Sequence, residues 1–490
     1  MNFINDITTS ILPETILTLF IILTAILSFT QRKEKQDITF YVSLIGVVLA
    51  TISLFVADFK SEFVAFFGIV VSNYFTFLFK LIILAGTFFT LLLSRDYARG
   101  FEKFTGEYYF LILTATLGAM LLCGANDLVM LFVGLETLSI SSFILCGYTK
   151  GDWLSIEAGL KYLIYGAVAS AVMLYGFSFI YGITGHTNFG LIAANLSSYE
   201  LNSLLVMALL LTLAGFGFKV SAVPFHAWAP DVYQGAPIPI AAYLSVVSKA
   251  AGFAILIRFI NLLLPNAAII SIILTTIAVI TMTIGNLMAL GQQNIRRLMA
   301  YSSIAHAGYV LLGVAVLTND GVTAAIFYLV TYLFMNFGVW AAIELFALVT
   351  GKDNIDNFNG LAYKHKSFAF ALAVCLLSLA GIPITAGFFS KFYLFKAVAV
   401  AGYAYMPVLL IALANTVVAL FYYMRIIKAM YILPEDEIRR SGIFRVSPPL
   451  KVVMAICVAA VVLIGVFATP FIEKSQISSS FVVSFRLSGL

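Results

Sequence analysis

Long apolar segments alternate with short polar ones along almost the whole chain. Apolar runs of about 20 residues, the length that crosses the hydrocarbon core of a bilayer as an α-helix, recur from Pro13 to Phe471. The pattern predicts an all-α polytopic membrane protein with about 14 transmembrane helices. The predicted helices begin near Glu14, Thr39, Phe75, Tyr108, Leu128, Tyr162, Leu201, Pro239, Ala268, Leu298, Val322, Phe368, Met406 and Val452.

Composition supports the membrane assignment. Of the 490 residues, 62% are hydrophobic and 10% charged, and the mean hydropathy is +1.04, values that no ordinary soluble domain reaches. The first apolar run follows an acidic stretch and has no small-residue cleavage site before its polar exit at Gln31. We therefore expect a retained helix rather than a cleaved signal peptide.

Basic residues gather in every second predicted loop. Eighteen of the 28 Lys and Arg residues fall in loops that follow odd-numbered helices, and such residues concentrate on the cytoplasmic side of membranes. These are Arg32, Lys33, Lys35, Arg95, Arg99, Lys103, Lys150, Arg296, Arg297, Lys352, Lys364, Lys366, Arg425, Lys428, Arg439, Arg440, Arg445 and Lys451. The opposite loops hold Lys60, Lys396, Lys474 and Arg486. We predict that both termini face away from the cytoplasm. The asymmetry explains the net charge of +5 without a nucleic-acid partner.

Part of the chain repeats after 166 residues. The run LLTLAG ending at Gly215 matches LLSLAG ending at Gly381, and ITG ending at Gly185 matches VTG ending at Gly351. The offset carries helices 4–8 onto helices 9–13, and because five is an odd number the two copies are inverted, as in many transporters. The predicted parts are residues 1–107 with helices 1–3, 108–264 with the first repeat, 265–430 with the second, and 431–490 with a cytoplasmic loop and helix 14.

Helices 7 and 12 are predicted to be broken at corresponding places. Pro224 follows Lys219 by five residues, and Pro383 precedes Lys391 by eight. Proline frees backbone carbonyls, which survive inside a membrane only where protein or water satisfies them. Kinks that merely aid packing are the alternative, but the lysine beside each break favours an ion site.

Other charges lie within the apolar runs. Glu136 and Lys249 are near the middle of helices 5 and 8, where a charge is costly and usually functional. Lys161, at the predicted start of helix 6, can reach the headgroups, so its position alone leaves its role open. Lys80 and Arg258 lie nearer helix ends, and snorkelling to the headgroups is the favoured interpretation.

Two histidines are candidate proton relays. His226 follows the break in helix 7 and His306 is in the middle of helix 10. Imidazole titrates near neutral pH and can pass a proton between lysines, although a hydrogen-bonded structural histidine is the alternative. The position of Glu344 in helix 11 does not assign it a role.

The chain offers no obvious redox centre. Cys123, Cys146, Cys375 and Cys457 stand singly in apolar runs without C-x-x-C spacing, and no Gly-rich nucleotide fingerprint is present. We expect no cofactor and no metal in this chain, so any electron chemistry belongs to partners.

Three motifs resemble a known family. They are GFGFKVSAVPFHAWAPDVYQGAP from Gly215, QQNIRRLMAYSSIAHAGY from Gln292 and GIPITAGFFSKFYLF from Gly381. They are similar to the antiporter-like membrane subunits of respiratory complex I, proton-pumping NADH:quinone oxidoreductase, and the first most resembles the N (NuoN) type. The resemblance covers nearly the whole chain.

The resemblance implies roles for the buried charges. In this family the glutamate matched by Glu136 pairs with the lysine matched by Lys161. The helix 7 lysine is matched by Lys219, the helix 8 lysine that bridges the two half-channels by Lys249, and the helix 12 lysine on the exit side by Lys391. Quinone reduction elsewhere drives their protonation. The chain would thus be a translocase subunit without its own redox chemistry.

The same resemblance implies partners and place. NADH, FMN, iron–sulfur clusters and quinone are expected in partner subunits, among them M-type antiporter-like and small K- and J-type membrane subunits. The expected location is a bacterial inner membrane, with a thylakoid or organellar membrane as the alternative.

Three alternatives remain open from sequence. A stand-alone Na⁺/H⁺ antiporter would use the same repeat and lysines, and a ferredoxin–plastoquinone oxidoreductase would contain a similar subunit. A purely structural scaffold would not need Lys219 or Lys249 for pumping.

Overall fold

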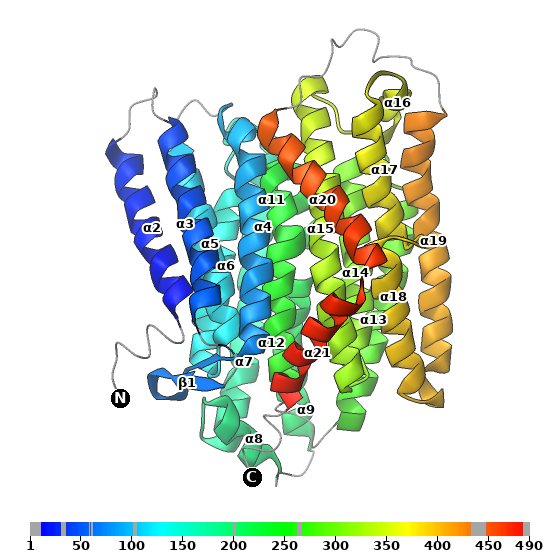
Figure 1. Cartoon of the computed structure of the whole chain (residues 1–490). Helices are drawn as coiled ribbons and strands as arrows, with labels where there is room; N and C mark the ends of the chain where they lie inside the picture. Colours follow the sequence, from blue (N-terminus) through cyan, green and yellow to red (C-terminus); the bar gives the residue numbers. More distant parts are fainter. Residues whose placement is uncertain are drawn as a thin grey trace.

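The computed structural model of the chain describes residues 11–30, 36–57, 59, 62–100, 105–197, 199, 202–261, 267–432 and 447–483. Within them, thirteen helices are long and apolar enough to cross a membrane, and α17 (Lys366–Ala380) with α18 (Ala386–Val400) makes a fourteenth, broken crossing (Figure 1). The predicted all-helical fold is confirmed. Outside the described residues lie Arg32, Lys33, Lys35, Lys60, Lys103, Leu201, Arg439, Arg440, Arg445 and Arg486.

The N-terminal part contains three long helices and a small hairpin. Its elements are α2 (Leu12–Thr30), α3 (Gln36–Val56), β1 (Phe63–Ala65), η2 (Phe66–Gly68), β2 (Val70–Ser72) and α4 (Tyr74–Ala98). The strands are antiparallel with Phe63 opposite Ser72. Sequence did not predict this hairpin, because strands of three residues are too short to show an alternating pattern.

The first repeat follows. It consists of α5 (Thr105–Gly124), α6 (Leu128–Cys146), α7 (Trp153–Thr184), α8 (Phe189–Ser197), α9 (Ser203–Val220), α10 (Trp228–Gly235), α11 (Ile238–Tyr243), the π-helical η3 (Leu244–Ser248) and α12 (Lys249–Asn261). The helix α7 begins nine residues before the predicted Tyr162, because the Asp152 side chain accepts a hydrogen bond from the Leu154 amide and caps it. Lys161 is therefore two turns inside α7.

The second repeat and the C-terminal part complete the bundle. They comprise α13 (Ala267–Leu290), α14 (Ile295–Ala315), α15 (Asn319–Thr350), η5 (Ile355–Phe358), α16 (Leu361–Lys364), α17, α18, η6 (Tyr403–Tyr405), α19 (Met406–Tyr431), α20 (Pro448–Val466) and α21 (Thr469–Val483). Sequence did not predict α21, whose polar residues interrupt the apolar pattern.

The repeat is visible in α7 and α15. Each has 32 residues, both ends are displaced by the predicted 166 positions, and each helix ends at a glycine with positive φ, Gly185 or Gly351. In Figure 1, α8 follows α7 at the lower end of the bundle, whereas α16 follows α15 at the upper end. The two helices thus run in opposite directions, as an inverted repeat requires.

Both predicted breaks are present. The helix α9 ends at Val220, with Ser221 at φ 59°, and a turn leads to α10. The helix α17 ends at Ala380, with Gly381 at φ 90°, before α18 begins. Positive φ is easy for glycine and costly for other residues, so the glycine at the second break follows from backbone geometry.

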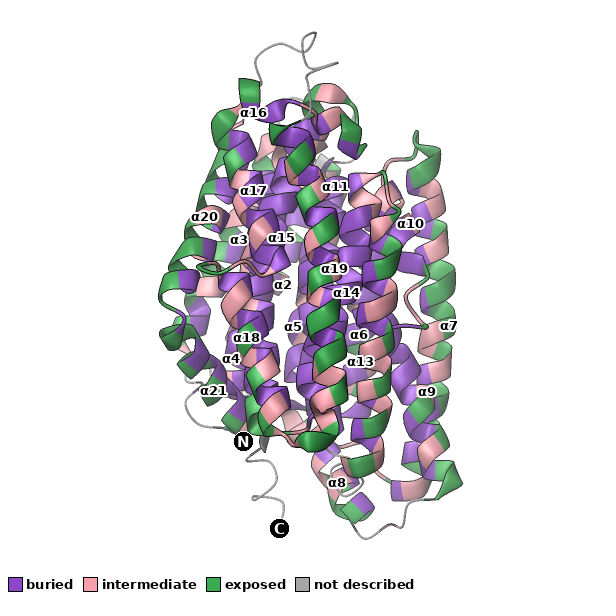
Figure 2. Cartoon of the chain, turned by 90° about the vertical axis from the view of Figure 1, so that its right-hand side faces the viewer, coloured by how far each residue is buried: buried purple, intermediate pink, exposed green. Residues whose placement is uncertain are grey.

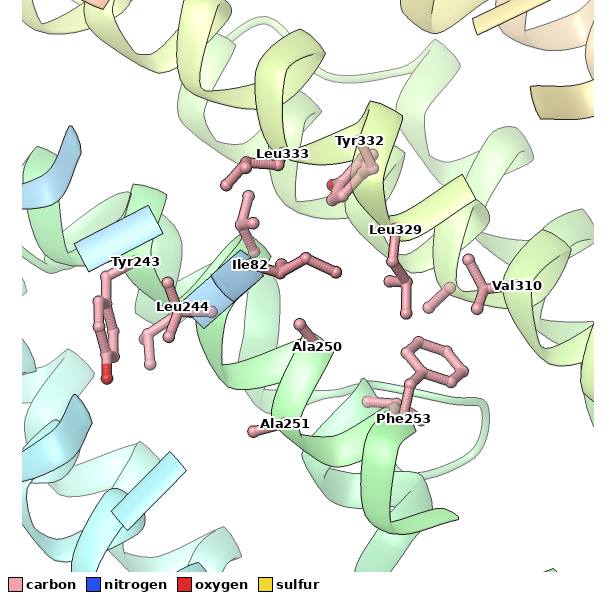
Figure 3. Packing of buried hydrophobic residues seen from close by; sticks show 14 of the residues in the cluster. Ile82, Tyr243, Leu244, Ala250, Ala251, Phe253, Val310, Leu329, Tyr332 and Leu333 are labelled. Atoms are coloured by element: carbon pink, nitrogen blue, oxygen red, sulfur yellow. The ribbon is translucent and has the colours of Figure 1, made fainter. Parts of the chain in front are cut away.

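The bundle has a buried centre and an apolar exterior. The most apolar stretches of α14 and of the α11–α12 segment are wholly buried, whereas only 17% of the most apolar stretch of α19 is buried. Figure 2 shows exposed residues along α7, α19 and α20. Exposed Phe29, Val417 and Phe421 suit a lipid surround. Ile82 of α4, Phe253 of α12 and Leu333 of α15 belong to one cluster of buried hydrophobic residues in the core (Figure 3).

Candidate functional site

Glu136 and Lys219 lie near each other beside α6. Lys219, buried in the last turn of α9, donates a hydrogen bond to Ser139 Oγ at 2.9 Å. Ser139 is one turn beyond Glu136 on α6, and the two charges interact electrostatically. Glu136 also accepts a 2.5 Å hydrogen bond from Ser170 of α7. This half of the site therefore contains an acid and a lysine within one helical turn of each other.

Lys249 lies deeper, where α12 begins after the π-helical η3. Its Nζ donates to the Ser303 carbonyl of α14 at 2.8 Å, and the side chain is buried. One turn further on, Gly252 faces Lys219, since a Cβ at Gly252 would lie 3.2 Å from Lys219 Cγ. The stem of Lys219 thus packs against the same helix turn that carries Lys249.

His306 lies beyond Lys249 in the same row of side chains, which begins with Glu136 and Lys219. It is buried in α14, one turn from Ser303. Its Nδ1 lies 2.7 Å from the Tyr328 hydroxyl of α15, and its Nε2 lies 3.0 Å from the Tyr423 hydroxyl of α19. Both ring nitrogens are hydrogen-bonded to hydroxyls that can donate or accept, an arrangement that suits a relay as well as a structural role.

Lys391 binds carbonyl groups at the break between α17 and α18, which is the predicted break of helix 12. Its Nζ donates to the carbonyls of Leu379 and Ala380 at 3.0 Å each, in the last turn of α17. It also lies 5.3 Å from the centroid of the Tyr309 ring. Carbonyls at a helix C-terminus have no intrahelical donor and attract cations, so the break supplies the partners of the lysine.

Lys161 does not pair with Glu136. Its Nζ lies 2.6 Å from Glu157 and 2.5 Å from Asp231, and its side chain is 37% exposed. Ser170, the partner of Glu136, is nine residues further along α7, or about 13 Å at 1.5 Å per residue. The pair implied by the resemblance is therefore not formed here, because closer carboxylates occupy Lys161.

Asp231 was missed by sequence reasoning. This residue of α10 also accepts from Arg297 of α14 at 2.5 Å, so it ties α7, α10 and α14 together with Lys161. Burial raises the pKa of Asp231, but hydrogen bonds from Lys161 and Arg297 outweigh burial and hold that pKa below its usual value. The signal available in sequence was its position just after the break, in the motif that carries the family resemblance.

His226 lies apart from the row. It is half-buried in the turn between α9 and α10, and its Nδ1 makes no hydrogen bond. Burial lowers the pKa of His226, which favours the neutral imidazole, while a backbone hydrogen bond at Pro224 opposes this. Among the described hydrogen bonds, none joins His226 to the buried lysines, and its relay role stays a prediction.

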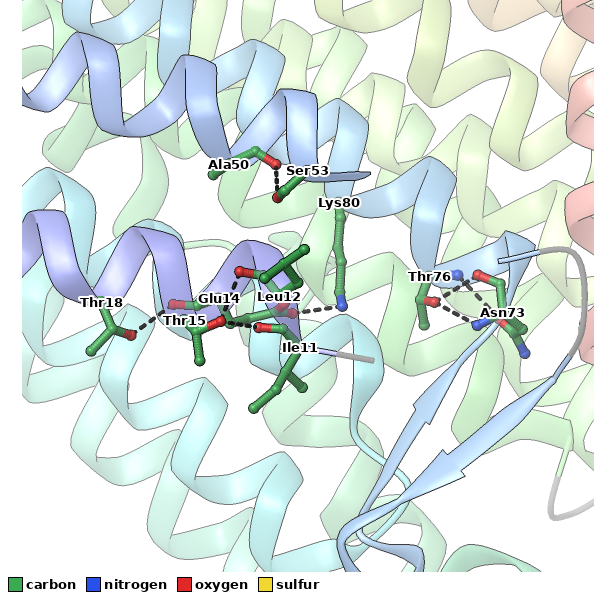
Figure 4. A network of polar contacts seen from close by, with 10 residues as sticks. All are labelled: Ile11, Leu12, Glu14, Thr15, Thr18, Ala50, Ser53, Asn73, Thr76 and Lys80. Atoms are coloured by element: carbon green, nitrogen blue, oxygen red, sulfur yellow. Dashed lines mark hydrogen bonds and ion pairs between the residues drawn. The ribbon is translucent and has the colours of Figure 1, made fainter. Parts of the chain in front are cut away.

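The snorkelling prediction for Lys80 and Arg258 was wrong. Lys80 Nζ lies 2.6 Å from Glu14, and their side chains are 0% and 5% exposed (Figure 4). Arg258 is buried with its guanidinium 5.3 Å from the centroid of the Phe75 ring. Both side chains point inward, because the neighbouring helices cover the ends of α4 and α12.

The second repeat has no lysine where the first has Lys249. The corresponding Asn415 of α19 accepts from Asn286 and donates to Thr283, both at 3.1 Å. Thr385, which corresponds to Lys219, donates to the Ile382 carbonyl. Neutral groups therefore replace the charges, and the row is asymmetric on a symmetric scaffold.

The cysteines are separate from this row. All four are buried and unbridged, and in the described ranges no group of three or more His, Cys, Asp or Glu side chains is arranged to hold a metal ion.

Sequence comparison points to one family. A model described as NADH:quinone oxidoreductase/Mrp antiporter, TM, matches residues 125–419. The chain is 42% identical over 473 residues to NAD(P)H-quinone oxidoreductase subunit 2 of Thermosynechococcus vestitus, covering 94% of this chain and 91% of that one. It is 39% identical over 485 residues to NADH-quinone oxidoreductase subunit N of Chlorobium chlorochromatii, covering 96% and 94%.

Solved structures agree. A chain of respiratory complex I from Thermus thermophilus matches with a TM-score of 0.80 and 30% identity, over 94% of this chain and 98% of that one. A chain of the Mrp complex from a Dietzia species matches with a TM-score of 0.85 over 97% and 99%, and at 19% identity this second likeness concerns the fold alone.

Proposed function

Because this chain belongs to the NADH:quinone oxidoreductase/Mrp antiporter family and is an antiporter-like membrane subunit of a quinone oxidoreductase complex, we propose that it moves protons along its buried charge row. The observation that carries the proposal is the succession Glu136, Lys219, Lys249, His306 and Lys391, in which each side chain is linked to the next through a shared helix turn or hydrogen-bonded neighbours.

The partners of the lysines suit reversible protonation. Lys219, Lys249 and Lys391 bind a hydroxyl or carbonyl oxygens rather than a carboxylate. For Lys249 and Lys391, loss of a proton then leaves no unpaired buried anion, which would be costly. Two neighbouring charged lysines repel each other in a low-dielectric interior, so a proton that arrives at one favours departure from the next.

The energy for this cycle has to come from outside the chain. Moving one charge against the membrane potential costs about 2.3 kcal/mol per 100 mV. We infer that quinone reduction in partner subunits supplies it, that NADH, FMN, iron–sulfur clusters and quinone are bound there, and that M-type and small K- and J-type subunits flank this chain. The buried, unbridged cysteines support a subunit without its own redox centre.

We place the subunit in a bacterial inner membrane with the upper end of Figure 1 facing the cytoplasm. The support is the set of basic residues at that end, such as Arg296, Arg297 and Lys366. Cyanobacterial and chloroplast relatives make a thylakoid membrane the alternative.

The test is proton pumping by the assembled complex in sealed vesicles. Lys219→Ala, Lys249→Ala and Glu136→Gln should each lower pumping by about 100-fold, as expected when a positioned proton-transfer group is lost. Lys366→Ala, at an exposed position at the start of α17, is the matched control and should pump normally. If all three variants assemble and pump like the unmodified complex, the row does not conduct protons.

A further inference from the structure

Every fourth residue along the middle of α15 is polar or aromatic with a polar atom. These residues, here called the α15 ridge, are Tyr328, Tyr332, Asn336, Trp340 and Glu344. All five are buried. Residues at this spacing form a continuous ridge on a helix, and sixteen residues at 1.5 Å each give a length of about 24 Å. The ridge therefore spans most of the thickness of a bilayer core.

Four consecutive members of the ridge carry buried atoms that make no hydrogen bond with the protein. They are the Tyr332 hydroxyl, Asn336 Oδ1, Trp340 Nε1 and both oxygens of Glu344. Buried polar atoms are nearly always hydrogen-bonded, to protein or to ordered water. Four such residues in succession on one ridge point to water along it rather than to a packing defect.

The inner end of the ridge reaches the proton row. The Tyr328 hydroxyl is 2.7 Å from His306 Nδ1. Asn336 donates to Ser245 Oγ at 2.9 Å, four residues before Lys249. The Tyr332 side chain lies close to the side chains of Ser303 and Asn336, and the Ser303 carbonyl binds Lys249. Figure 3 shows Tyr332 facing the core from α15.

The outer end reaches the upper surface. Glu344 interacts electrostatically with Asp96, near the upper end of α4. The Asp96 side chain is 20% exposed, yet its Oδ2 is buried without a hydrogen bond. A partly exposed carboxylate thus lies within electrostatic range of the buried Glu344 carboxyl at this end of the ridge.

We propose that Glu344 is a proton-binding site and that the α15 ridge is a hydrated path for proton uptake from the upper face to Lys249 and His306. This inference rests on the proposed function. A buried carboxyl without a partner is most stable when it carries a proton, and intramembrane acids commonly serve proton relays. A hydronium ion gives its proton to the Glu344 carboxylate and becomes water. The Glu344 carboxylic acid then releases a proton, which ridge water relays to the neutral amine of Lys249, so that an ammonium group forms and the carboxylate is restored.

The order of donors and acceptors suits bridging water. Trp340 Nε1 can only donate, and Asn336 Oδ1 can only accept. A water molecule between them would accept from the first and donate to the second, while the Tyr332 hydroxyl does either. The tryptophan orients water in this path and does not itself carry the proton.

The first experiment measures proton pumping by the assembled complex in sealed vesicles. Glu344→Gln keeps the shape but removes the proton-binding oxygen, and Asn336→Leu keeps a similar volume but removes both polar atoms. Each should lower pumping at least about tenfold. Thr331→Val is the matched control, because Thr331 is buried on α15 outside the ridge and its hydroxyl donates to the Tyr328 carbonyl of the same helix. It should pump normally.

The outcomes separate this inference from the proposed function. If Lys249→Ala stops pumping while Glu344→Gln and Asn336→Leu pump normally, the ridge path is wrong and the charge row stands. If Lys249→Ala pumps normally, the charge row itself is wrong. Infrared difference spectroscopy provides a second readout: Glu344→Asp should shift the absorption of a protonated carboxylic acid. Absence of any such shift in the assembled complex would overturn the assignment of Glu344, even if the glutamine variant fails to fold.

Discussion

At the scale of residues, the three lysines of the charge row bind uncharged oxygens in three different settings. Lys219 binds a serine hydroxyl, Lys249 an internal helix carbonyl and Lys391 the carbonyls at a broken helix end. Sequence predicted these lysines from their depth in apolar runs. It could not predict the first two partners, which are 80 and 54 residues away and depend on helix packing. The Lys391 partners were within reach of prediction, because the break is local.

The geometry around Lys391 gives a test at one residue. Gly381 has φ 90°, and a Cβ there would lie 3.0 Å from Lys391 Cδ and 3.4 Å from Nζ. Gly381→Ala should therefore lower stability by about 1–2 kcal/mol and displace the lysine. We expect a lower unfolding temperature and slower pumping by the assembled complex. Gly182→Ala, in α7 with open space around it, should lower neither, and equal effects of the two variants would contradict the role of Gly381.

At the scale of elements, hydropathy predicted the number of membrane helices and most of their starts. It failed where polar residues extend a helix, as in the first two turns of α7, where Glu157 and Lys161 form an ion pair. Because of that extension Lys161 lies two turns inside α7 rather than at its start, where it was expected. The apolar pattern indicates which part of a helix can lie in lipid, whereas capping and ion pairs decide where the helix begins.

The Glu14–Lys80 ion pair is expected to hold α2 against α4. Both side chains are buried, and the distance is 2.6 Å. Removing one partner of a buried pair leaves an uncompensated charge and costs about 3–5 kcal/mol. Glu14→Leu should therefore lower the thermal unfolding temperature of the purified complex strongly.

The double variant is the control for this pair. Glu14→Leu combined with Lys80→Met removes both charges and should recover much of the lost stability, since apolar replacements of a buried pair are often neutral. If the single and double variants unfold at the same temperature, charge pairing is not what stabilises this contact.

At the scale of the whole molecule, the inverted repeat builds a symmetric frame and the charges break its symmetry. The offset of 166 residues and the opposite directions of the copies were predicted from sequence alone. In the structure α7 and α15 have equal lengths, and each ends at a glycine. The positions of Lys249 and Asn415 correspond, yet one is a cation and the other a hydrogen-bonded amide. The two halves therefore offer different protonatable groups on corresponding backbones, while the direction of net transport is set by the energy supplied from outside the chain.

Direction across the membrane is open to a chemical test. Gly151 follows α6 at the upper end, with open space around it, and Tyr403 follows α18 at the lower end, 92% exposed. Gly151→Cys should react with a membrane-impermeant maleimide only from the cytoplasmic side, and Tyr403→Cys only from the opposite side. The four native cysteines are buried, so background labelling should be low. If each cysteine reacts from the other side instead, the orientation is opposite to the one proposed. Uptake along the α15 ridge would then begin from the non-cytoplasmic face, and the orientation would contradict the distribution of basic residues.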